Sequence, residues 1–180
     1  MNFYLDYENR DLIKSGSDMM GLLIESIILC LIFFVICFLG TGNDEKNIKS
    51  FESYPDEIQS IIINNDRFKN KIVMKSPYIS FISNVFIFSI VLFICGIIIR
   101  SDSWKQNFLN ILILGEVLNA FDFFFIDMIW WRNTKRVRFK GTEKLDSIYK
   151  NSEKHIRSFL KGIVVFVIVG VIDTIILFFI

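Results

Sequence analysis

GEVLNAFDFFFID, residues 115–127, is an apolar stretch that nevertheless carries three acidic side chains, Glu116, Asp122 and Asp127. The segment around it, about residues 107–131, is long enough to cross a bilayer, since a spanning helix takes about 20 mostly apolar residues. A charged side chain at the membrane centre costs roughly 2.5–3.5 kcal/mol on insertion scales. Three acids in one span therefore indicate either a working site or a specific role in helix packing.

The composition indicates an integral membrane protein. Hydrophobic residues make up 53% of the chain and the mean hydropathy is +0.48, which is more apolar surface than a soluble domain of this length can bury. The net charge of +1 argues against a nucleic-acid partner. All three cysteines lie in apolar runs and the single histidine, His155, lies outside them, so we expect no metal site. No nucleotide, phosphate-loop or hydrolase motif is present, and we expect no cofactor.

Four apolar segments predict an all-α fold, an integral membrane four-helix bundle. The expected spans cover about residues 20–40, 78–99, 107–131 and 158–180. Two polar loops, about 41–77 and 132–157, separate the first span from the second and the third from the fourth. The absence of repeats and of proline-rich or glycine-rich linkers favours a single membrane domain over residues 1–180.

Both polar loops carry helical patterns. SYPDEIQSIIINN, residues 53–65, predicts a short amphipathic helix capped by Ser53 or Tyr54, with Ile58, Ile61 and Ile62 on one face. In the other loop, apolar side chains recur at helical spacing from Leu145 to Phe159. This pattern predicts that the fourth helix begins in the cytoplasm and continues without a break into the fourth span.

The basic residues predict the orientation in the cell membrane. Sixteen of the 20 Lys and Arg residues lie in or beside the two long loops, and four lie in the N-terminal tail and the short second loop. Because positive residues stay in the cytoplasm, we expect the long loops inside and both termini outside the cell. Trp130, Trp131 and Arg132 then form an anchor at the inner membrane surface.

Depth along the spans sorts the intramembrane polar residues into two layers. At a rise of about 1.5 Å per residue, the outer layer lies roughly 7–13 Å below the outer surface. The outer layer holds Glu25, Glu116 and Asp173, with Asn119 just beneath. The inner layer holds Ser80, Asn84 and Asp127, with Asp122 near the middle of the membrane. The candidate ion or proton site comprises Glu25, Glu116, Asn119, Asp122 and Asp173.

Two residues of the outer layer, Glu116 and Asp173, are expected to come together. Their depths match, and Gly162 and Gly170 lie on the same helical arc as Asp173, which predicts that this face turns toward the bundle centre. We expect the two carboxyl groups to share a proton, an ion or a water molecule.

The alternative is that these acids have a structural role and hold the helices together. Protonated carboxyl groups would bond to Asn119, Asn84 or serines and fix the helix packing, although such interhelical bonds contribute only about 0.6–2 kcal/mol each. In the same interpretation Glu25 reaches the lipid headgroups and Asp127 pairs with Arg132. Both interpretations stay open at the level of sequence.

The basic run RNTKRVRFK, residues 132–140, predicts contact with anionic lipid headgroups at about 1 kcal/mol per basic residue. The residues expected there are Arg132, Lys135, Arg136 and Arg138. The alternative is that this run serves only as the topology signal.

The blocks SYPDEIQ, DFFFIDMIWW and RVRFKGTEK resemble those of a family of small four-span membrane proteins of Gram-positive bacteria for which no activity is established. The resemblance implies a membrane location and a four-helix design, and it carries over no catalytic residue. It places Asp122, Asp127, Gly141, Thr142 and Glu143 in the recognisable core. It also implies that a cytoplasmic helix begins at Thr142 and Glu143.

Three functions fit these features. The first is an interaction or accessory subunit of a membrane complex that uses the cytoplasmic loops as its contact surface. The second is a proton- or cation-coupled transporter, and the third is a membrane-embedded enzyme that acts on lipid or isoprenoid groups with Glu116 and Asp173 as acid and base. We favour the first, which is not an enzyme. The expected partners are membrane lipids and another membrane protein or a second copy of this chain.

Cysteine labelling tests the predicted orientation. With the native cysteines replaced, Leu5→Cys should react with a membrane-impermeant maleimide added to intact cells, and Ser60→Cys should react only after the membrane is opened. Reaction at position 60 but not at position 5 would invert the topology and both depth layers.

Overall fold

The computed structural model describes residues 2–68, 71, 72, 74 and 76–180, with side chains described from residue 19 onward. Its elements, in chain order, are α1 (Asn2–Leu39), α2 (Asp44–Asn47), the 3-10 helix η1 (Ile48–Ser53), α3 (Asp56–Ile63), α4 (Pro77–Ile98), α5 (Trp104–Phe121), the π-helix η2 (Asp122–Trp131), the 3-10 helix η3 (Lys135–Val137), α6 (Asp146–Tyr149) and α7 (Glu153–Phe179). No strand occurs among these residues, which confirms the all-α prediction.

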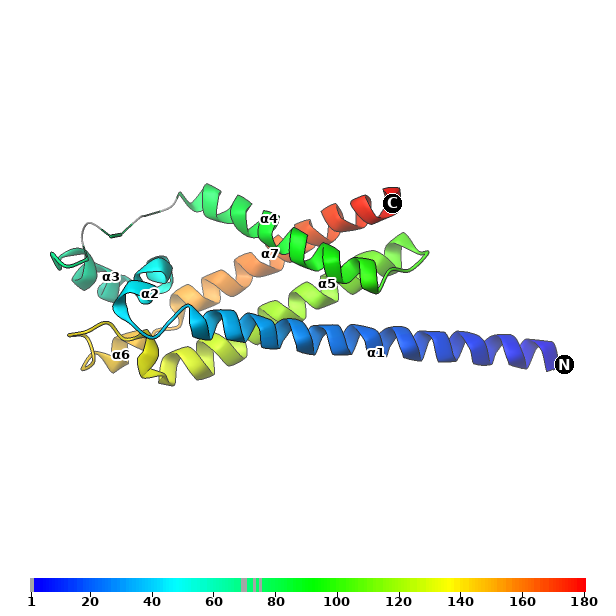
Figure 1. Cartoon of the computed structure of the whole chain (residues 1–180), viewed down its shortest axis with the longest axis horizontal. Coiled ribbons are helices and arrows are strands. Elements are labelled where there is room, and N and C mark those ends of the chain that lie inside the picture. The colour runs from blue at the N-terminus through cyan, green and yellow to red at the C-terminus, as the bar shows by residue number, and fades with distance from the viewer. Residues whose placement is uncertain (1, 69–70, 73, 75) are drawn as a thin grey trace.

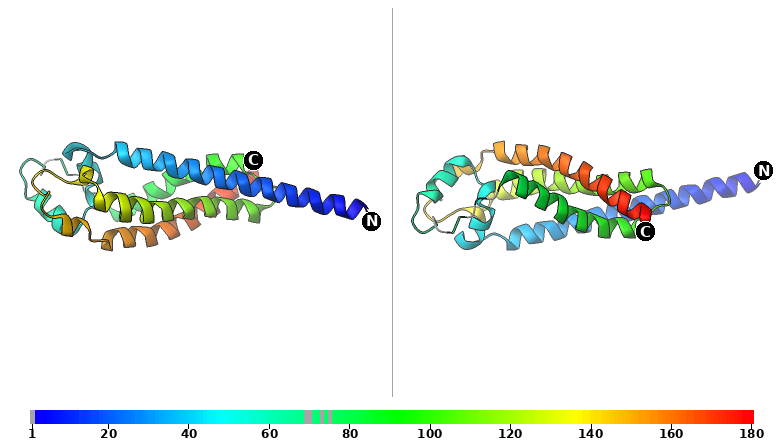
Figure 2. Two further views of the ribbon diagram at one scale, coloured as in Figure 1. Left: turned by 90° about the horizontal axis from the view of Figure 1, so that it is seen from below. Right: turned by 90° about the horizontal axis from the view of Figure 1, so that it is seen from above.

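Four helical segments are long and apolar enough to cross a membrane, as predicted: Met19–Leu39, Pro77–Ile98, Trp104–Trp131 and Asp146–Phe179. They run alongside one another, and the two long connections gather at one end of the bundle (Figure 1). Both chain termini lie toward the opposite end, and α1 projects beyond the other helices there (Figure 2). We name these the loop end and the terminal end.

Close approach of α5 and α7 forms the centre of the bundle. A methyl group added at Gly115 of α5 would lie 2.5 Å from the Phe166 ring of α7, and one added at Gly170 of α7 would lie 3.2 Å from Phe108. Gly162 lies directly against the Asn119 side chain. Small residues let helix backbones approach in a membrane, so the predicted inward arc of Gly162 and Gly170 is confirmed. In contrast, α4 and residues 19–39 of α1 expose most of their apolar side chains, as lipid-facing helices do.

The two long loops fold together into one compact unit at the loop end, which we call the cap (residues 41–68 and 132–152). Its core is aromatic and aliphatic, and it draws on both loops and on the end of η2. The buried members are Phe51, Tyr54, Ile58, Ile62, Phe68, Trp131, Val137, Phe139 and Tyr149. Five of these residues come from the first loop, three from the second and one from η2, so neither loop can bury its apolar side chains without the other.

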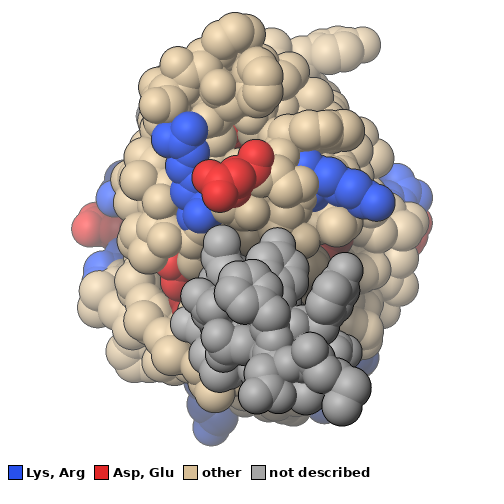
Figure 3. All heavy atoms as spheres, turned by 90° about the vertical axis from the view of Figure 1, so that its right-hand side faces the viewer, with Lys and Arg blue, Asp and Glu red and all other residues tan. Residues whose placement is uncertain are grey.

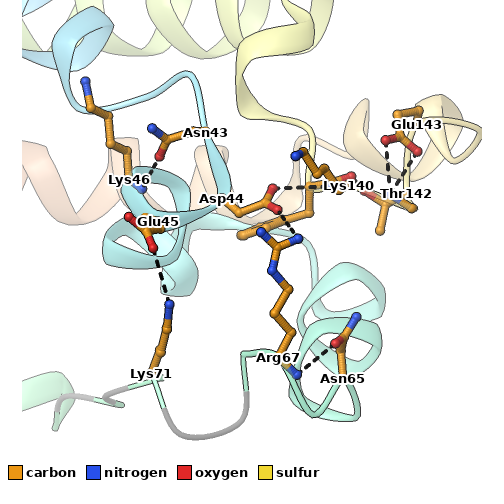
Figure 4. A network of polar contacts seen from close by, with 12 residues as sticks. Asn43, Asp44, Glu45, Lys46, Asn65, Arg67, Lys71, Lys140, Thr142 and Glu143 are labelled. Atoms are coloured by element: carbon orange, nitrogen blue, oxygen red, sulfur yellow. Dashed lines mark hydrogen bonds and ion pairs between the residues drawn. The ribbon is translucent and has the colours of Figure 1, made fainter.

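Polar contacts also join the two halves of the cap. Asn47 is fully buried, and its Nδ2 donates to the backbone oxygen of Arg136 at 3.0 Å. Asp44 accepts a hydrogen bond from the Lys140 backbone N–H at 3.1 Å and forms an ion pair with Arg67 at 3.2 Å (Figure 4). Asp44 and Asn47 therefore connect the first loop to the second in the same way that the core does.

The amphipathic helix of the first loop is confirmed with two differences. Helix α3 starts after Pro55, and no side chain caps it, so neither Ser53 nor Tyr54 has the predicted capping role. Ile58 and Ile62 are buried in the cap, whereas Ile61 is 41% exposed. Tyr54 lies in the cap core instead. Its ring centroid is 5.0 Å from that of Trp131 and 4.9 Å from that of Phe139.

The predicted continuous helix from Leu145 into the fourth span is wrong. Helix α6 ends at Tyr149 and α7 begins at Glu153. The Tyr149 hydroxyl lies 2.6 Å from Thr142 Oγ1 and accepts a hydrogen bond from the Phe139 backbone N–H, which fixes Tyr149 in the cap core. Asn151 Oδ1 then accepts from the Glu153 N–H at 3.0 Å and satisfies a free donor at the start of α7.

Thr142 and Glu143 do not start a helix, as the family resemblance implied, but lie in a turn. Gly141 has a φ of +91°, a left-handed conformation that favours glycine. The Glu143 carboxylate accepts the Gly141 backbone N–H at 2.9 Å, and this bond holds the pKa of Glu143 below its usual range. Residues 141–143 therefore form a tight turn where the resemblance implied the start of a helix.

Glycine substitutions test the close packing of α5 on α7. Gly115→Ala should destabilise the protein by about 1–3 kcal/mol, because the added methyl overpacks against Phe166. Gly21→Ala is the matched control, since its nearest neighbour, Ile99, would lie 3.9 Å away, and it should be neutral or stabilising. The measurement is unfolding of each purified variant in detergent, and equal stability of the two variants would contradict this packing.

Candidate functional site

Glu116 serves the contact between α5 and α7. Its Oε2 accepts a hydrogen bond from Asn119 Nδ2 at 3.3 Å, and the same amide donates to the backbone oxygen of Phe159 at 3.2 Å. The other carboxylate oxygen is buried and has no hydrogen-bond partner within the described chain. Asn119 therefore links α5 to α7, and Glu116 holds the Asn119 amide from within α5 while one of its own carboxylate oxygens stays unpaired.

Asp173 has a different partner. It is completely buried, and its Oδ1 accepts a hydrogen bond from the Ser89 hydroxyl of α4. Gly115 packs against Phe166 while Gly170 packs against Phe108, so Asp173 lies about two helical turns from Glu116 along α5. The expectation that Glu116 and Asp173 share one proton or ion is wrong, because counting residues from the span ends ignored the actual register of the helices.

The remaining residues of the two predicted layers do not join either acid. Both carboxylate oxygens of Glu25 are buried without a hydrogen-bond partner, so the side chain does not extend to the headgroups. Asn84 is exposed on the outside of α4, and Ser80 is half-buried there. Glu25, Glu116 and Asp173 therefore share no hydrogen-bond partner among the described residues, and Asn84 does not face the interior of the bundle.

The acidic stretch of residues 115–127 changes from α-helix to π-helix at Asp122. In η2 each backbone N–H bonds five residues back, and this brings residues five apart, such as Asp122 and Asp127, to the same side. The two carboxyl groups interact electrostatically with each other and with Cys37 of α1. In an α-helix the same two acids would point in clearly different directions. The π-helix thus creates an acidic pair that sequence spacing did not predict.

A histidine completes this cluster. His155 Nδ1 lies 2.9 Å from Asp127 Oδ2, and His155 is only 5% exposed. Its ring packs edge-on to Trp131, with 6.0 Å between centroids. Asp127 therefore pairs with His155 and not with Arg132, whose guanidinium contacts Met128 Sδ instead. We call Cys37, Asp122, Asp127, Trp131 and His155 the junction, because they lie where the bundle meets the cap.

Sequence reasoning set His155 aside because it lies outside the apolar runs. A usable signal was present, since His155 and Asp127 flank the same polar loop and both lie close to the predicted inner membrane surface. A buried imidazole held at Nδ1 by a carboxylate has a fixed ring orientation, with Nε2 left to interact with something else. Here His155 Nε2 and Trp131 Nε1 are both buried and without a partner in the described chain.

The junction has only part of the arrangement required for covalent catalysis. An Asp–His pair that activates a nucleophile needs a hydroxyl or thiol within hydrogen-bond reach of Nε2. No hydrogen bond joins Cys37 or any other described side chain to His155 Nε2. The geometry favours a structural or ion-handling role for the junction over nucleophilic chemistry.

Two of the four predicted headgroup contacts have internal roles. Arg136 Nη2 donates to the backbone oxygens of Phe38 and Thr41 at 3.2 and 3.0 Å, and its guanidinium lies 3.9 Å above the Phe38 ring centroid. Arg136 therefore caps the C-terminal end of α1. Arg138 is turned inward onto the Tyr149 ring at 4.1 Å. Lys135 stays exposed and suits a headgroup.

A double-mutant cycle measures the coupling within the junction. Asp127→Asn and His155→Ala should each destabilise the protein, and the double variant should lose less than the sum, with a coupling of about 0.5–3 kcal/mol. The reason is that His155→Ala leaves the buried Asp127 carboxylate without its partner, and Asp127→Asn replaces a charge-assisted hydrogen bond with a weaker neutral one. Asp127→Asn combined with Glu116→Gln is the control and should be additive. Unfolding in detergent provides the readout, and additive losses for the Asp127–His155 pair would refute the contact.

Comparison with protein-family models, curated proteins and solved structures found no match to this chain. The resemblance to small four-span proteins of Gram-positive bacteria therefore stays a prediction, and the chain is placed by its own geometry as a polytopic helical membrane protein.

Proposed function

We propose that this protein is an interaction or accessory subunit of a membrane complex, and that its cap is the contact surface. The observation that carries the proposal is the folding of two loops, separated by two membrane spans, around one shared core. Loops that only connect spans and set orientation need no buried core of this kind. A folded unit fixed on a small bundle suits a protein that presents a surface to a partner.

The way the cap is attached supports this role. Arg136 bonds the second loop to the end of α1, and Lys154 at the start of α7 forms an ion pair with Asp56 of the first loop. The first and fourth spans are therefore connected to the cap through specific polar contacts. Through these contacts, binding of a partner to the cap would change the positions of the membrane helices.

The dispersal of the carboxyl groups also favours the interaction role over an enzyme. Glu116 bonds to Asn119, Asp173 bonds to Ser89, and Glu25 bonds to neither. An acid–base pair acting on a lipid requires two groups that face one reacting centre. The described residues do not bring Glu116 and Asp173 to one centre.

The proposed orientation follows from the basic residues. The loop end carries sixteen of the 20 Lys and Arg residues, counted over the loops and the start of the fourth span. We place this end in the cytoplasm and both termini on the extracytoplasmic side of the cell membrane. The cap then faces cytoplasmic partners, with Arg132 and Lys135 near the anionic lipid surface.

One specific observation favours a second candidate, a proton- or cation-coupled transporter. Buried carboxylate oxygens of Glu25, Glu116 and Asp173 have no hydrogen-bond partner in the described chain. Unpaired acids inside a membrane are costly and commonly mark ion or proton pathways. This candidate and the accessory role are compatible, because a subunit of a complex can also bind an ion.

Co-purification from the native membrane tests the accessory role. Ile61 is an exposed apolar residue of the cap, so Ile61→Glu should weaken a protein contact without disturbing the cap core. Ser147→Glu adds the same charge at another exposed position of the cap and is the matched control. After crosslinking in cells, wild type and Ser147→Glu should retain a defined protein partner, and Ile61→Glu should lose most of it. Recovery of lipid alone with all three proteins would contradict the proposal.

A further inference from the structure

Asp173 is an acidic side chain buried inside the bundle. It is 0% exposed, its Oδ1 is bonded to the Ser89 hydroxyl, and its Oδ2 is buried without a partner. No described basic side chain pairs with it. An isolated carboxylate in hydrocarbon loses its hydration, and the loss must be offset by a positive charge close to the oxygens.

Its neighbour in the chain adds a second unused oxygen. Thr174 is 6% exposed, and its Oγ1 is buried without a hydrogen-bond partner. A threonine hydroxyl in a membrane helix ordinarily bonds back to the preceding turn, and the Thr174 hydroxyl has no such bond. Ser89 and Asp173 join α4 to α7 through their hydrogen bond, and Thr174 adds an unpaired hydroxyl at the next position of α7.

The chemistry of this set selects the ligand. Oxygen ligands without sulfur or imidazole suit protons and hard cations and do not suit soft metals. Calcium and magnesium need six or more oxygen ligands, commonly from several carboxylates or retained waters. One carboxylate carries one negative charge, so a site made of one carboxylate and hydroxyl groups is neutralised by a single positive charge.

Few other charges act on this position. Helix α4 contains no Asp, Glu, Lys or Arg, and its titratable groups are Tyr78 and Cys95. On α5 the charged residues are Lys105 and Glu116, and Glu116 lies about two turns away. Lys161 and Arg157 lie near the opposite end of α7. The charge balance at Asp173 therefore depends on what binds to it.

A hollow at the terminal end is lined by Leu177, one helical turn beyond Asp173 on α7. It has a volume of about 340 Å³ and is lined by Arg100, Ser101, Asp102, Trp104, Asn107, Leu177 and Phe178. Side chains of both charge signs lie close together on the surface at this end (Figure 3). Leu177 lies one helical turn beyond Asp173 on the same face of α7, and it is 1% exposed. A methyl group added at Gly96 would lie 3.2 Å from both Leu177 and Ile111, so these two side chains meet over Gly96.

We propose that Ser89, Asp173 and Thr174 form a binding site for one positive charge, a proton or a monovalent metal cation, reached from the terminal hollow past Leu177. The site goes beyond the accessory role and gives the transport candidate a defined location. The site does not depend on the cap. Failure of the co-purification test would therefore not contradict the site, and failure of the tests at Asp173 would not contradict the accessory role.

Carbodiimide labelling tests the site in the intact protein. Dicyclohexylcarbodiimide is apolar and reaches buried carboxyl groups. A neutral acid adds across one C=N bond of the reagent, with its proton going to nitrogen and its oxygen to carbon, and the resulting O-acylisourea rearranges to a stable N-acylurea that mass spectrometry locates. In the purified full-length protein we expect modification at Asp173. Because the reagent needs the neutral acid, modification should fall as pH rises or as a bound metal cation displaces the proton.

Salt dependence then separates the two sources of charge. The labelling rate at Asp173 is measured in sodium, lithium, potassium or choline chloride at fixed ionic strength and pH. A rate lowered by one of the metal cations relative to choline assigns the site to that cation. A rate that depends on pH alone assigns it to the proton. Absence of labelling, with melting temperatures that respond equally to pH and salt in wild type and Asp173→Asn, would overturn the proposal.

Variants test the ligand set and the route. Thr174→Val keeps the shape of the side chain, removes the hydroxyl and should reduce the pH or salt response at Asp173, whereas Glu116→Gln should leave it unchanged. Leu177→Ala should speed labelling several-fold by opening the route, and Leu160→Ala, at an exposed position of the same helix, is the control. Equal labelling rates for the two leucine variants would exclude access past Leu177.

Discussion

The contact of α5 with α7 sets the positions of the other elements. Gly115, Gly162 and Gly170 let the two backbones come close, and each accepts a specific neighbour, Phe166, Asn119 or Phe108. In a membrane the helices gain little from burying apolar surface, so close packing and hydrogen bonds decide their register. That register separates Glu116 from Asp173 and presents Asp173 to Ser89 on α4.

A second constraint operates where the bundle meets water. The loops are too polar to enter the membrane and too rich in aromatic residues to stay unfolded, so they bury Tyr54, Phe139 and Tyr149 against each other. The buried Asn47 and Asp44 make this association specific, because an unpaired polar group in such a core costs about 1–3 kcal/mol. The cap is thus determined by both loops jointly.

The sequence predicted the features that depend on local pattern. Hydropathy predicted the four spans, and helical periodicity predicted α3 and the inward arc of Gly162, Gly170 and Asp173. It did not predict the break before Glu153, since that break arises when Tyr149 finds partners in the cap. The Asp127–His155 pair was missed for a similar reason, because π-helical bonding and a long-range contact leave no periodic signal.

The bond from Arg136 to the end of α1 has a mechanical consequence. Helix α1 has 38 residues, which at about 1.5 Å per residue makes a rod of about 57 Å, nearly twice the thickness of the hydrocarbon core. One end of this rod is held at the cap by a cation, two carbonyl groups and an aromatic ring. A tilt of about 10° at that pivot would sweep the far end through about 10 Å, given the same rise per residue. Helix α1 therefore has the proportions of a lever arm whose pivot lies at the cap.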